Sequence, residues 1–329
     1  MYPFTLIKAK NNREAITATG NNTGAKFIGG GTNIVDLMKM NIEKPQQLVD
    51  INLLGLKKIE VLPNGNILIG ALVKNSDMAY DETIRSKYPL LSKAVLSGAS
   101  AQLRNMATTG GNVLQRTRCP YFFDTAVPCN KREPGSGCSA IKGYNRMHAV
   151  LGTSNSCIAT NPSDMCVALA AIDAVVHVEG VNGNRSVNFI DFHLLPGGTP
   201  DKENVLQQGD LITGIEIPSL PFASNSTYVK VRDRTSYEFA LASAAVALQV
   251  SGGTIQNARI ALGGIATKPW RAKEAEQYLT DKNATIETYK AAADIALKDA
   301  TTYQYNNFKP ELAKRTLICA LQNTGGNHE

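Results

Sequence analysis

The stretch "KFIGGGTNIVDLMKM" (residues 26–40) decides what kind of domain this chain forms. It begins with an apolar run typical of a short strand, breaks at three consecutive glycines, and resumes with Ile34, Leu37 and Met38 spaced along one helix face. Consecutive glycines let a backbone approach a diphosphate with its N–H groups turned toward it, and the N-terminus of the following helix adds partial positive charge. The pattern is neither G-x-G-x-x-G nor a P-loop G-K-[ST], so nucleotide folds built on those fingerprints are not supported.

A second loop repeats this chemistry. The segment "LRNMATTGGNVLQ" (103–115) contains Thr108-Thr109-Gly110-Gly111-Asn112, which again combines hydroxyls, paired glycines and an amide. One such loop is equally well explained as a tight turn without a ligand. Two of them in one domain favour a dinucleotide held from both sides.

The bulk composition limits the classes of function. A chain of 329 residues exceeds one typical core, which predicts two or three domains, and 43% apolar with 19% charged residues describes an ordinary globular protein. The net charge of +6 is mildly basic. Because the one dense basic patch coincides with a cysteine-bearing segment, we expect no nucleic acid partner, whereas an acidic cofactor or partner surface fits.

The sequence is expected to carry no targeting signal of its own. The N-terminal "MYPFTLIKAKNN" lacks the charged and apolar regions of a signal peptide, and no apolar run approaches the ~20 residues of a membrane span. Alone, the chain is expected in the cytoplasm; bound to a partner that carries a signal, it would travel with that partner.

The remaining pattern alternates short strands and helices. Asn64-Gly65 marks a hairpin, residues 88–100 read as a helix, and "NPSDMCVALAAIDAVVHVEG" (161–180) reads as a capped, buried helix running into a strand. Residues 218–226 are the best linker candidate, and three helical segments end the chain, within 272–279, 284–300 and 310–322. The order predicts an α+β protein.

Four of the six cysteines lie on one long connection, at Cys119, Cys129, Cys138 and Cys157. Disulfides would need an oxidising compartment, structural zinc usually uses a short C-x(2–4)-C knuckle that is missing here, and an iron–sulfur cluster can collect four thiolates from a wrapped loop. Residues 113–160 carry six basic and two acidic side chains, a net of +4 that would offset anionic thiolates. These observations favour a metal or cluster site over structural thiols without excluding the latter. Cys166 and Cys319 are predicted to be packed thiols.

With these residues described, the sequence resembles the FAD-binding medium subunits of the molybdenum hydroxylase (xanthine dehydrogenase and carbon monoxide dehydrogenase) family over nearly its whole length. The resemblance rests on "KFIGGGTNI", "LRNMATTGGN", "NPSDMCVALAAIDA", "YVKVRDRTSYEFALAS" and "ALGGIATKPWRAKEAE", in that order. The segments "QRTRCPYFFDT", "PCNKREPGSGC" and "CIATNPSDM" are similar to the FAD and [4Fe–4S] subunits of bacterial periplasmic-type aldehyde oxidoreductases.

The resemblance implies a two-part, PCMH-type FAD-binding domain over 1–222, with an N-terminal lobe of about 1–56, a second lobe of about 57–222 and an iron–sulfur loop at 113–160. A smaller α+β C-terminal domain would occupy 223–329. It implies that FAD is contacted along the first loop by Lys26, Phe27, Ile28, Gly29, Gly30, Gly31, Thr32, Asn33 and Ile34. Further FAD contacts are implied for Thr108, Gly111, Asn112, Asp164, Ile212 and Lys230.

Three of these positions have specific implied roles. Asp164 would contact the FAD, Ile212 would pack on the isoalloxazine ring, and Lys230 would lie at the flavin edge, where a cation stabilises added electron density. Asp164 could instead be a helix N-terminal acid and Ile212 plain core. Lys74 departs from the family, where Thr is common. Neither loop contains a His or Cys to link a flavin, so binding is expected to be non-covalent.

The implied activity is electron transfer within a heterotrimer. A large partner subunit with a molybdenum cofactor would oxidise an aldehyde with water to a carboxylic acid, and a small partner with [2Fe–2S] clusters would pass electrons to the FAD of this chain and on to an external acceptor. The four cysteines at 119, 129, 138 and 157 would ligate one [4Fe–4S] cluster. No catalytic residue is expected in this chain, and His148, His177, His193 and His328 show no triad-like or metal-ligand grouping in the sequence. With a signal-bearing partner, the assembly would be periplasmic.

Other functions compete with this one. The same architecture serves 4-hydroxybenzoyl-CoA reductase-type and xanthine dehydrogenase-type enzymes. A stand-alone flavin oxidase would turn over by itself, and a zinc- or disulfide-stapled interaction module would be colourless.

Overall fold

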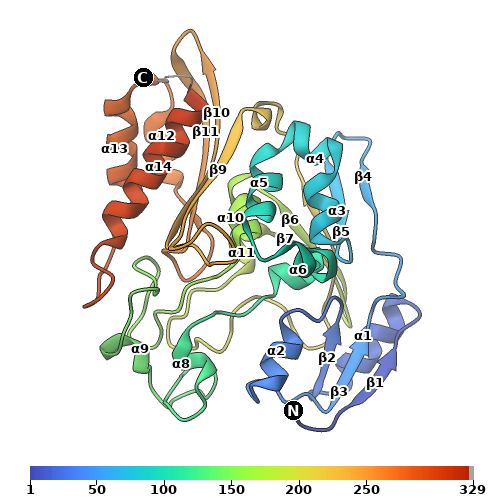
Figure 1. Ribbon diagram of the computed structural model, residues 1–329. Coiled ribbons are helices and arrows are strands. Elements are labelled where there is room, and N and C mark those ends of the chain that lie inside the picture. The colour runs from blue at the N-terminus through green and yellow to red at the C-terminus, as the bar shows by residue number, and fades with distance from the viewer. Residues whose placement is uncertain (326–329) are drawn as a thin grey trace.

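The first fifty residues form a small α/β lobe of their own. The structure, a computed structural model that describes residues 1–325, pairs three parallel strands in the order β1-β3-β2 (Figure 1). The elements in chain order are β1 (Thr5–Lys8), α1 (Asn12–Gly20), β2 (Ala25–Ile28), α2 (Ile34–Lys39) and β3 (Gln47–Asp50). Parallel strands end at a common edge, so the glycine run that follows β2 lies at the carboxyl edge of this sheet, where open α/β sheets bind ligands.

The second lobe is built on an antiparallel sheet of five strands, in the order β4-β5-β8-β6-β7. The predicted hairpin joins the first two of these strands, and Gly65 takes φ +82° in its turn, a conformation that glycine adopts freely. The strands are β4 (Ile59–Val61), β5 (Ile67–Gly70), β6 (Val175–Gly180), β7 (Gly183–Asn188) and β8 (Leu211–Ile217). The helices are α3 (Asn75–Tyr80), α4 (Glu82–Lys87), α5 (Pro89–Ser97), α6 (Ala101–Met106), α7 (Thr109–Val113), α8 (Pro120–Phe123), α9 (Ser139–Lys142), α10 (Asp164–Ala171) and α11 (Phe189–Phe192).

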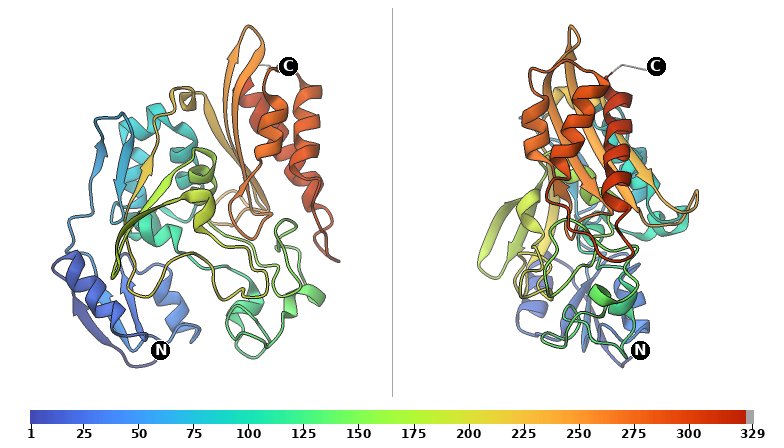
Figure 2. Two further views of the ribbon diagram at one scale, coloured as in Figure 1. Left: turned by 180° about the vertical axis from the view of Figure 1, so that it is seen from behind. Right: turned by 90° about the vertical axis from the view of Figure 1, so that its left-hand side faces the viewer.

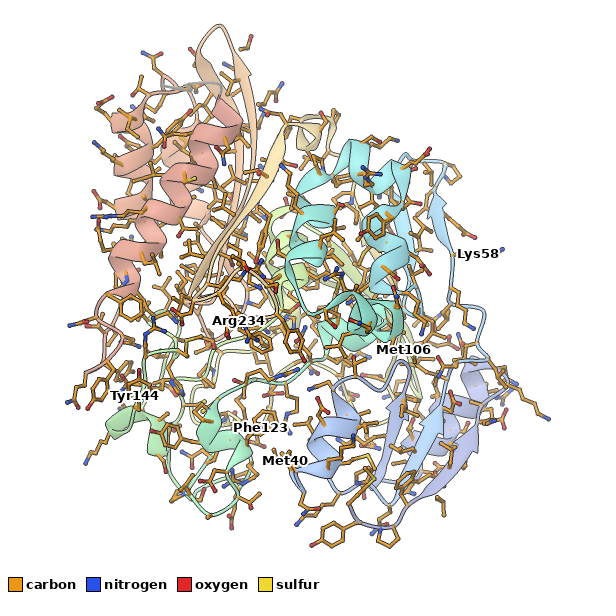
Figure 3. The ribbon with its side chains drawn as sticks, in the orientation of Figure 1. Met40, Lys58, Met106, Phe123, Tyr144 and Arg234 are labelled. Carbon is orange, nitrogen blue, oxygen red and sulfur yellow. The ribbon has the colours of Figure 1, made fainter. Side chains whose placement is uncertain are left out.

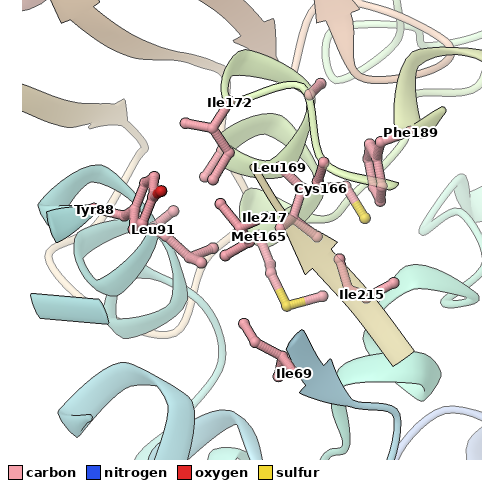
Figure 4. Packing of buried hydrophobic residues seen from close by; sticks show 14 of the residues in the cluster. Ile69, Tyr88, Leu91, Met165, Cys166, Leu169, Ile172, Phe189, Ile215 and Ile217 are labelled. Atoms are coloured by element: carbon pink, nitrogen blue, oxygen red, sulfur yellow. The ribbon is translucent and has the colours of Figure 1, made fainter. Parts of the chain in front are cut away.

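Helix α10 forms the centre of the core. Every residue from Met165 to Ala171 is buried, as the uniformly apolar sequence predicts for a helix with neighbours on all sides. Figure 4 shows its Leu169 between Leu91 of α5 and the strand residues Ile215 and Ile217. The buried helix that was predicted to run into a strand is therefore confirmed.

The C-terminal part is a third sheet, in the order β12-β11-β10-β9, with helices on one face (Figures 1 and 2). Its elements are η1 (Pro221–Ser224), β9 (Ser226–Val231), β10 (Ala242–Ser251), β11 (Thr254–Gly263), β12 (Trp270–Arg271), α12 (Lys273–Leu279), α13 (Ile286–Ala296) and α14 (Lys309–Gly325). Alternate residues of β10 point to opposite faces, so Val246 and Leu248 pack toward the three helices while Ala245 and Ala247 join the core around α10. Both faces of this sheet are thus buried, and the α+β prediction is confirmed.

The linker candidate at 218–226 is an ordered connection, which contains the 3-10 turn η1 and buries Ala223. The prediction that Cys319 is packed is wrong: its side chain is exposed, because it lies one helical turn after Arg315 on the outer face of α14. Within residues 1–325, no helix is both long and apolar enough to cross a membrane.

An ion-pair network joins the C-terminal sheet to the second lobe. Arg271 is 7% exposed, lies 2.6 Å from Asp173 after α10, and also binds Glu276 of α12 and the carbonyl of Ala170. Arg259 of β11 pairs with the other oxygen of Asp173 at 2.9 Å. The nearly buried guanidinium of Arg271 thereby connects the half-exposed Asp173 of one unit to the nearly buried Glu276 of the other.

We predict that Arg271→Met lowers the free energy of unfolding by about 3 kcal/mol, because removing one partner of a buried pair leaves the other charge uncompensated. Urea unfolding at equal flavin saturation measures this change. The exposed i,i+4 pair of Arg315 with Glu311 supplies a matched control, and Arg315→Met should change stability by less than about 0.5 kcal/mol. Equal effects of the two substitutions would contradict the assigned role of the network.

Candidate functional site

A cavity of about 980 Å³ lies where the N-terminal lobe, the second lobe and the loop between β9 and β10 meet. Both glycine loops form part of its wall, although they are about eighty residues apart in the chain. In Figure 3, Met106 at the end of α6 and Arg234 of the β9–β10 loop mark two of the segments that surround this region. The volume lies at the upper end of the range of small-molecule and cofactor sites.

The first glycine loop presents unused hydrogen-bond donors to the cavity. Within the described residues, none of the backbone N–H groups from Gly30 to Ile34 donates a hydrogen bond, and the side-chain nitrogen of Asn33 is buried without an acceptor. A buried donor such as the Asn33 nitrogen is normally paired, and together with the free N–H groups that border the cavity it marks a place for an anionic ligand. Val35 is the first residue whose N–H bonds back, to the carbonyl of Gly31 at 3.1 Å.

The second loop uses its donors internally. Thr108 caps α7, accepting from the N–H of Gly111 at 3.3 Å with its hydroxyl and from the N–H of Asn112 at 2.8 Å with its carbonyl. The N–H groups of Thr109 and Gly110 donate to carbonyls of the neighbouring segment 71–73. The two loops, which look alike in sequence, therefore offer different chemistry: the first offers backbone N–H groups and the second offers side chains.

The two loops touch at Gly30. A β-carbon on this residue would lie 1.9 Å from the carbonyl oxygen of Met106, which is closer than any real contact. Glycine is required here because of backbone-to-backbone approach. Lys74, the position that departs from the family, donates its amine to the same Met106 carbonyl at 3.0 Å.

A buried ion pair closes one side of the cavity. Lys230 of β9 lies 2.8 Å from Asp164, the first residue of α10, and also donates to the carbonyl of Ser97. The hydroxyl of Tyr228 donates to the other oxygen of Asp164 at 2.6 Å. Burial, and then the negative charge of Asp164, raise the pKa of Tyr228 well above its ordinary value, so this hydroxyl keeps its proton.

The structure brings the predicted FAD residues together. All of them line the 980 Å³ cavity except Ile28, whose side chain packs beneath the loop near Gly31. Ile212 is buried in β8 and reaches the cavity from the sheet. Two aromatic residues of the β9–β10 loop, Tyr237 and Phe239, also line the cavity. Sequence reasoning did not single them out, although both lie in the motif "YVKVRDRTSYEFALAS".

The four cysteines of the long connection line one small pocket of about 10 Å³. Cys129 and Cys138 face each other across an isolated antiparallel bridge, and Cys157 follows a tight turn at Ser154. All six cysteines are free thiols. Among residues 1–325, no three His, Cys, Asp or Glu side chains form a group that could hold a single metal ion.

Burial governs the protonation of these thiols. It raises the pKa of Cys119 to about 12, which backbone hydrogen bonds from Phe122 and Tyr121 only partly offset. Burial also raises the pKa of Cys157, against the opposing positive charge of Lys131. Without a bound metal, both therefore remain neutral thiols at physiological pH.

Acidic residues from other segments neutralise much of the segment's positive charge. Arg116 pairs with Glu43 of the N-terminal lobe and with Glu203, and Lys131 pairs with Glu203 at 2.7 Å. Arg146 pairs with Asp233. The net of +4 counted along the sequence thus overstates the positive charge around the cysteines.

A third cavity, of about 180 Å³, lies between the cysteine pocket and the large cavity. Cys119 and His148 line one part of it, and Asp164 and Phe239 line another. Because Cys119 also borders the cysteine pocket and Asp164 also borders the large cavity, the two sites are neighbours.

The histidines are not all isolated. The Oγ of Ser186 lies 3.0 Å from the Nδ1 of His177, and the Nε2 of His177 lies 2.7 Å from a carboxylate oxygen of Glu216. The sequence did not indicate this grouping. Cross-strand pairing on the five-stranded sheet brings these side chains together, on its solvent side and away from the cavities described above. His148 is 2% exposed and approaches Cys119, a contact that the sequence reasoning also missed.

Comparisons with known proteins agree with this geometry. Residues 2–220 match the family described as "FAD binding domain in molybdopterin dehydrogenase", and residues 226–321 match "CO dehydrogenase flavoprotein C-terminal domain". The chain is 49% identical to the aldehyde oxidoreductase FAD-binding subunit PaoB of Escherichia coli over 98% of both chains. It is 29% identical to the glyceraldehyde dehydrogenase medium chain of Sulfolobus acidocaldarius, over 91% of this chain and 88% of that one. Carbon monoxide dehydrogenase of Hydrogenophaga pseudoflava superimposes with a TM-score of 0.77 at 26% identity, covering 99% of each chain.

We predict that Gly30→Ala lowers FAD affinity at least tenfold, which corresponds to about 1.4 kcal/mol. The added methyl group would collide with the carbonyl of Met106 and force the two loops apart. Flavin fluorescence titration of the flavin-free chain measures the change. Gly198→Ala is the matched control, because a β-carbon at Gly198 meets no atom within 4 Å. Unchanged affinity in Gly30→Ala would contradict the role of the loop contact.

Proposed function

The chain belongs to the FAD-binding subunits of the molybdenum hydroxylase family, and we propose that it is the FAD- and [4Fe–4S]-carrying subunit of a heterotrimeric, molybdenum-dependent aldehyde oxidoreductase. In this reaction an aldehyde and water give a carboxylic acid, two protons and two electrons on a large partner subunit. A small partner with [2Fe–2S] clusters delivers the electrons to the FAD site of this chain, and an external acceptor removes them. The whole-length identity to an aldehyde oxidoreductase subunit carries the choice of reaction.

The described residues explain why such a chain would hold FAD without performing the oxidation. The unpaired N–H groups from Gly30 to Ile34 are suited to a diphosphate, and Ile212 supplies an apolar surface for a planar ring. Lys230, held by Asp164, supplies positive charge at the cavity wall. When bound, the flavin accepts electrons from one partner and releases them to another. The Ser186–His177–Glu216 group lies outside this cavity and contributes nothing to it.

The four-cysteine pocket supports the cluster part of the proposal. Cys119, Cys129, Cys138 and Cys157 line the same small pocket without forming a group close enough to hold a single ion, which suits a cubane more than one ion, because a cubane holds its thiolates further apart. The site lacks the short knuckle of structural zinc. A bound cluster would hold all four cysteines as thiolates and add a second electron carrier beside the flavin.

The compartment would follow the partners. We expect the chain to reach the periplasm only if it is exported with a signal-bearing subunit, and otherwise to remain in the cytoplasm.

We predict that Cys129→Ser lowers iron and acid-labile sulfide by more than half and weakens the broad visible absorption beneath the flavin bands, because one of four ligands is lost. Iron, sulfide and FAD are measured on the same anaerobically purified chain. Cys319→Ser, at an exposed cysteine of α14, is the matched control and should leave iron unchanged. One zinc and no iron in the wild-type chain would overturn the cluster proposal while leaving FAD binding intact.

We also predict that the purified chain, loaded with FAD, reduces no dye in the presence of aldehyde, because the reaction would take place on the large subunit. Addition of both partners should restore turnover. Aldehyde-dependent dye reduction by the isolated chain would instead favour a stand-alone flavin enzyme.

A further inference from the structure

His148 approaches the sulfur of Cys119 from within the cysteine segment. Its Nε2 lies 3.1 Å from the Sγ of Cys119, and the ring is buried beside that of Tyr121, with ring centroids 6.1 Å apart. The other ring nitrogen, Nδ1, is buried and has no hydrogen-bond partner in the described residues. The hydrogen-bond contact of the ring within the described residues is therefore a cysteine sulfur, and the carbonyl of Asn145 also lies close to the ring.

The geometry fixes which nitrogen carries the proton when Cys119 is a thiolate. A thiolate only accepts hydrogen bonds, so Nε2 must be the donor. The contact therefore suits a ligating sulfur, which has no proton of its own to donate.

The backbone of His148 is held rigidly by the C-terminal unit. Its carbonyl accepts from the amine of Lys309 at 2.9 Å and from the amide of Asn306 at 3.4 Å, and its N–H donates to the carbonyl of Asn145 at 3.0 Å. Lys309 is fully buried and also donates to the carbonyls of Met147 and Gly264. A ring anchored in this way has little freedom to leave the sulfur.

From these contacts we propose that His148 is a positioning residue for the cluster: its Nε2–H donates to the Sγ of Cys119, holds that ligand in place and raises the reduction potential of the cluster. This inference rests on the proposed function, because it requires the four cysteines to ligate iron. A hydrogen bond to a ligand sulfur withdraws electron density and favours the reduced, more negative form, which is one of the ways a protein sets the potential of an iron–sulfur cluster. His148 touches neither the large cavity nor its glycine loops.

The test compares two substitutions of His148 in the full chain. His148→Gln places an amide N–H at a similar distance from the backbone as Nε2 and retains a donor, whereas His148→Met fills a similar space without one. His193→Gln is the matched control, since His193 is also buried with an unpaired Nδ1, but its Nε2 contacts the carbonyl of Val113 at 3.0 Å rather than a sulfur. The readouts are iron, sulfide and FAD content, and the midpoint potential of the cluster in a redox titration followed by electron paramagnetic resonance.

We expect His148→Met to keep its FAD and to show a lower cluster potential than the wild type, His148→Gln to restore most of the difference, and His193→Gln to show none. If His148→Met loses iron while His148→Gln keeps it, the donor is needed to hold the ligand and the proposal stands. An unchanged potential in an iron-replete His148→Met variant, or loss of iron from both His148 variants, would overturn it. A wild-type chain that contains no iron would instead overturn the proposal that the four cysteines hold a cluster. The iron assay on the wild-type chain detects this outcome before any variant is made.

Discussion

The hydrogen bond from the Ser163 hydroxyl to the side-chain oxygen of Asn112, 2.6 Å long, is the contact on which the arrangement of the two sites depends. Asn112 belongs to α7 and the second glycine loop, and Ser163 caps α10 immediately before Asp164. The long cysteine segment leaves the domain at one of these residues and returns at the other. The segment is therefore a long loop whose two ends lie close together at the wall of the large cavity. A loop closed in this way leaves the rest of the FAD-binding fold undisturbed.

The C-terminal unit holds this loop through hydrogen bonds. Val150 and Leu151 donate to the carbonyl of Ile265, and the buried amine of Lys309 holds the backbone at 147–148. Burial, and then the positive charge of Arg146, lower the pKa of Lys309 to about 7, while donation to three carbonyls uses all three hydrogens of the charged amine. A lysine placed at such a cost indicates that the carbonyls it bonds need a donor there, which ties the cysteine segment to the C-terminal sheet.

Sequence reasoning worked where the signal is local or periodic. The glycine run between a strand and a helix and the uniformly apolar α10 each predict their own surroundings, because those patterns arise from short-range geometry. It failed where one face of an element had to be chosen or two distant segments had to meet. Cys319 looks packed in "TLICALQ" yet points outward, and the contact of His148 with Cys119 depends on the path of a loop without periodicity. The similarity of the two glycine loops hid the difference in their free donors, which depends on carbonyls of the 71–73 segment.

Electrostatics around the cysteines is local rather than a property of the segment's net charge. Three of the six cations that the sequence assigns to this loop pair with carboxylates elsewhere, and Glu203 alone engages both Arg116 and Lys131. Burial raises the pKa of Glu203, but the opposing effects of Lys131 and Arg116 outweigh burial and lower the pKa, so the carboxylate stays charged and neutralises these cations. The sulfurs are then influenced chiefly by groups in direct contact, such as the His148 ring on Cys119 and the N–H of Ala159 at 3.4 Å from the sulfur of Cys157. In a buried pocket, single hydrogen bonds of this kind act strongly on the charge that the sulfurs carry.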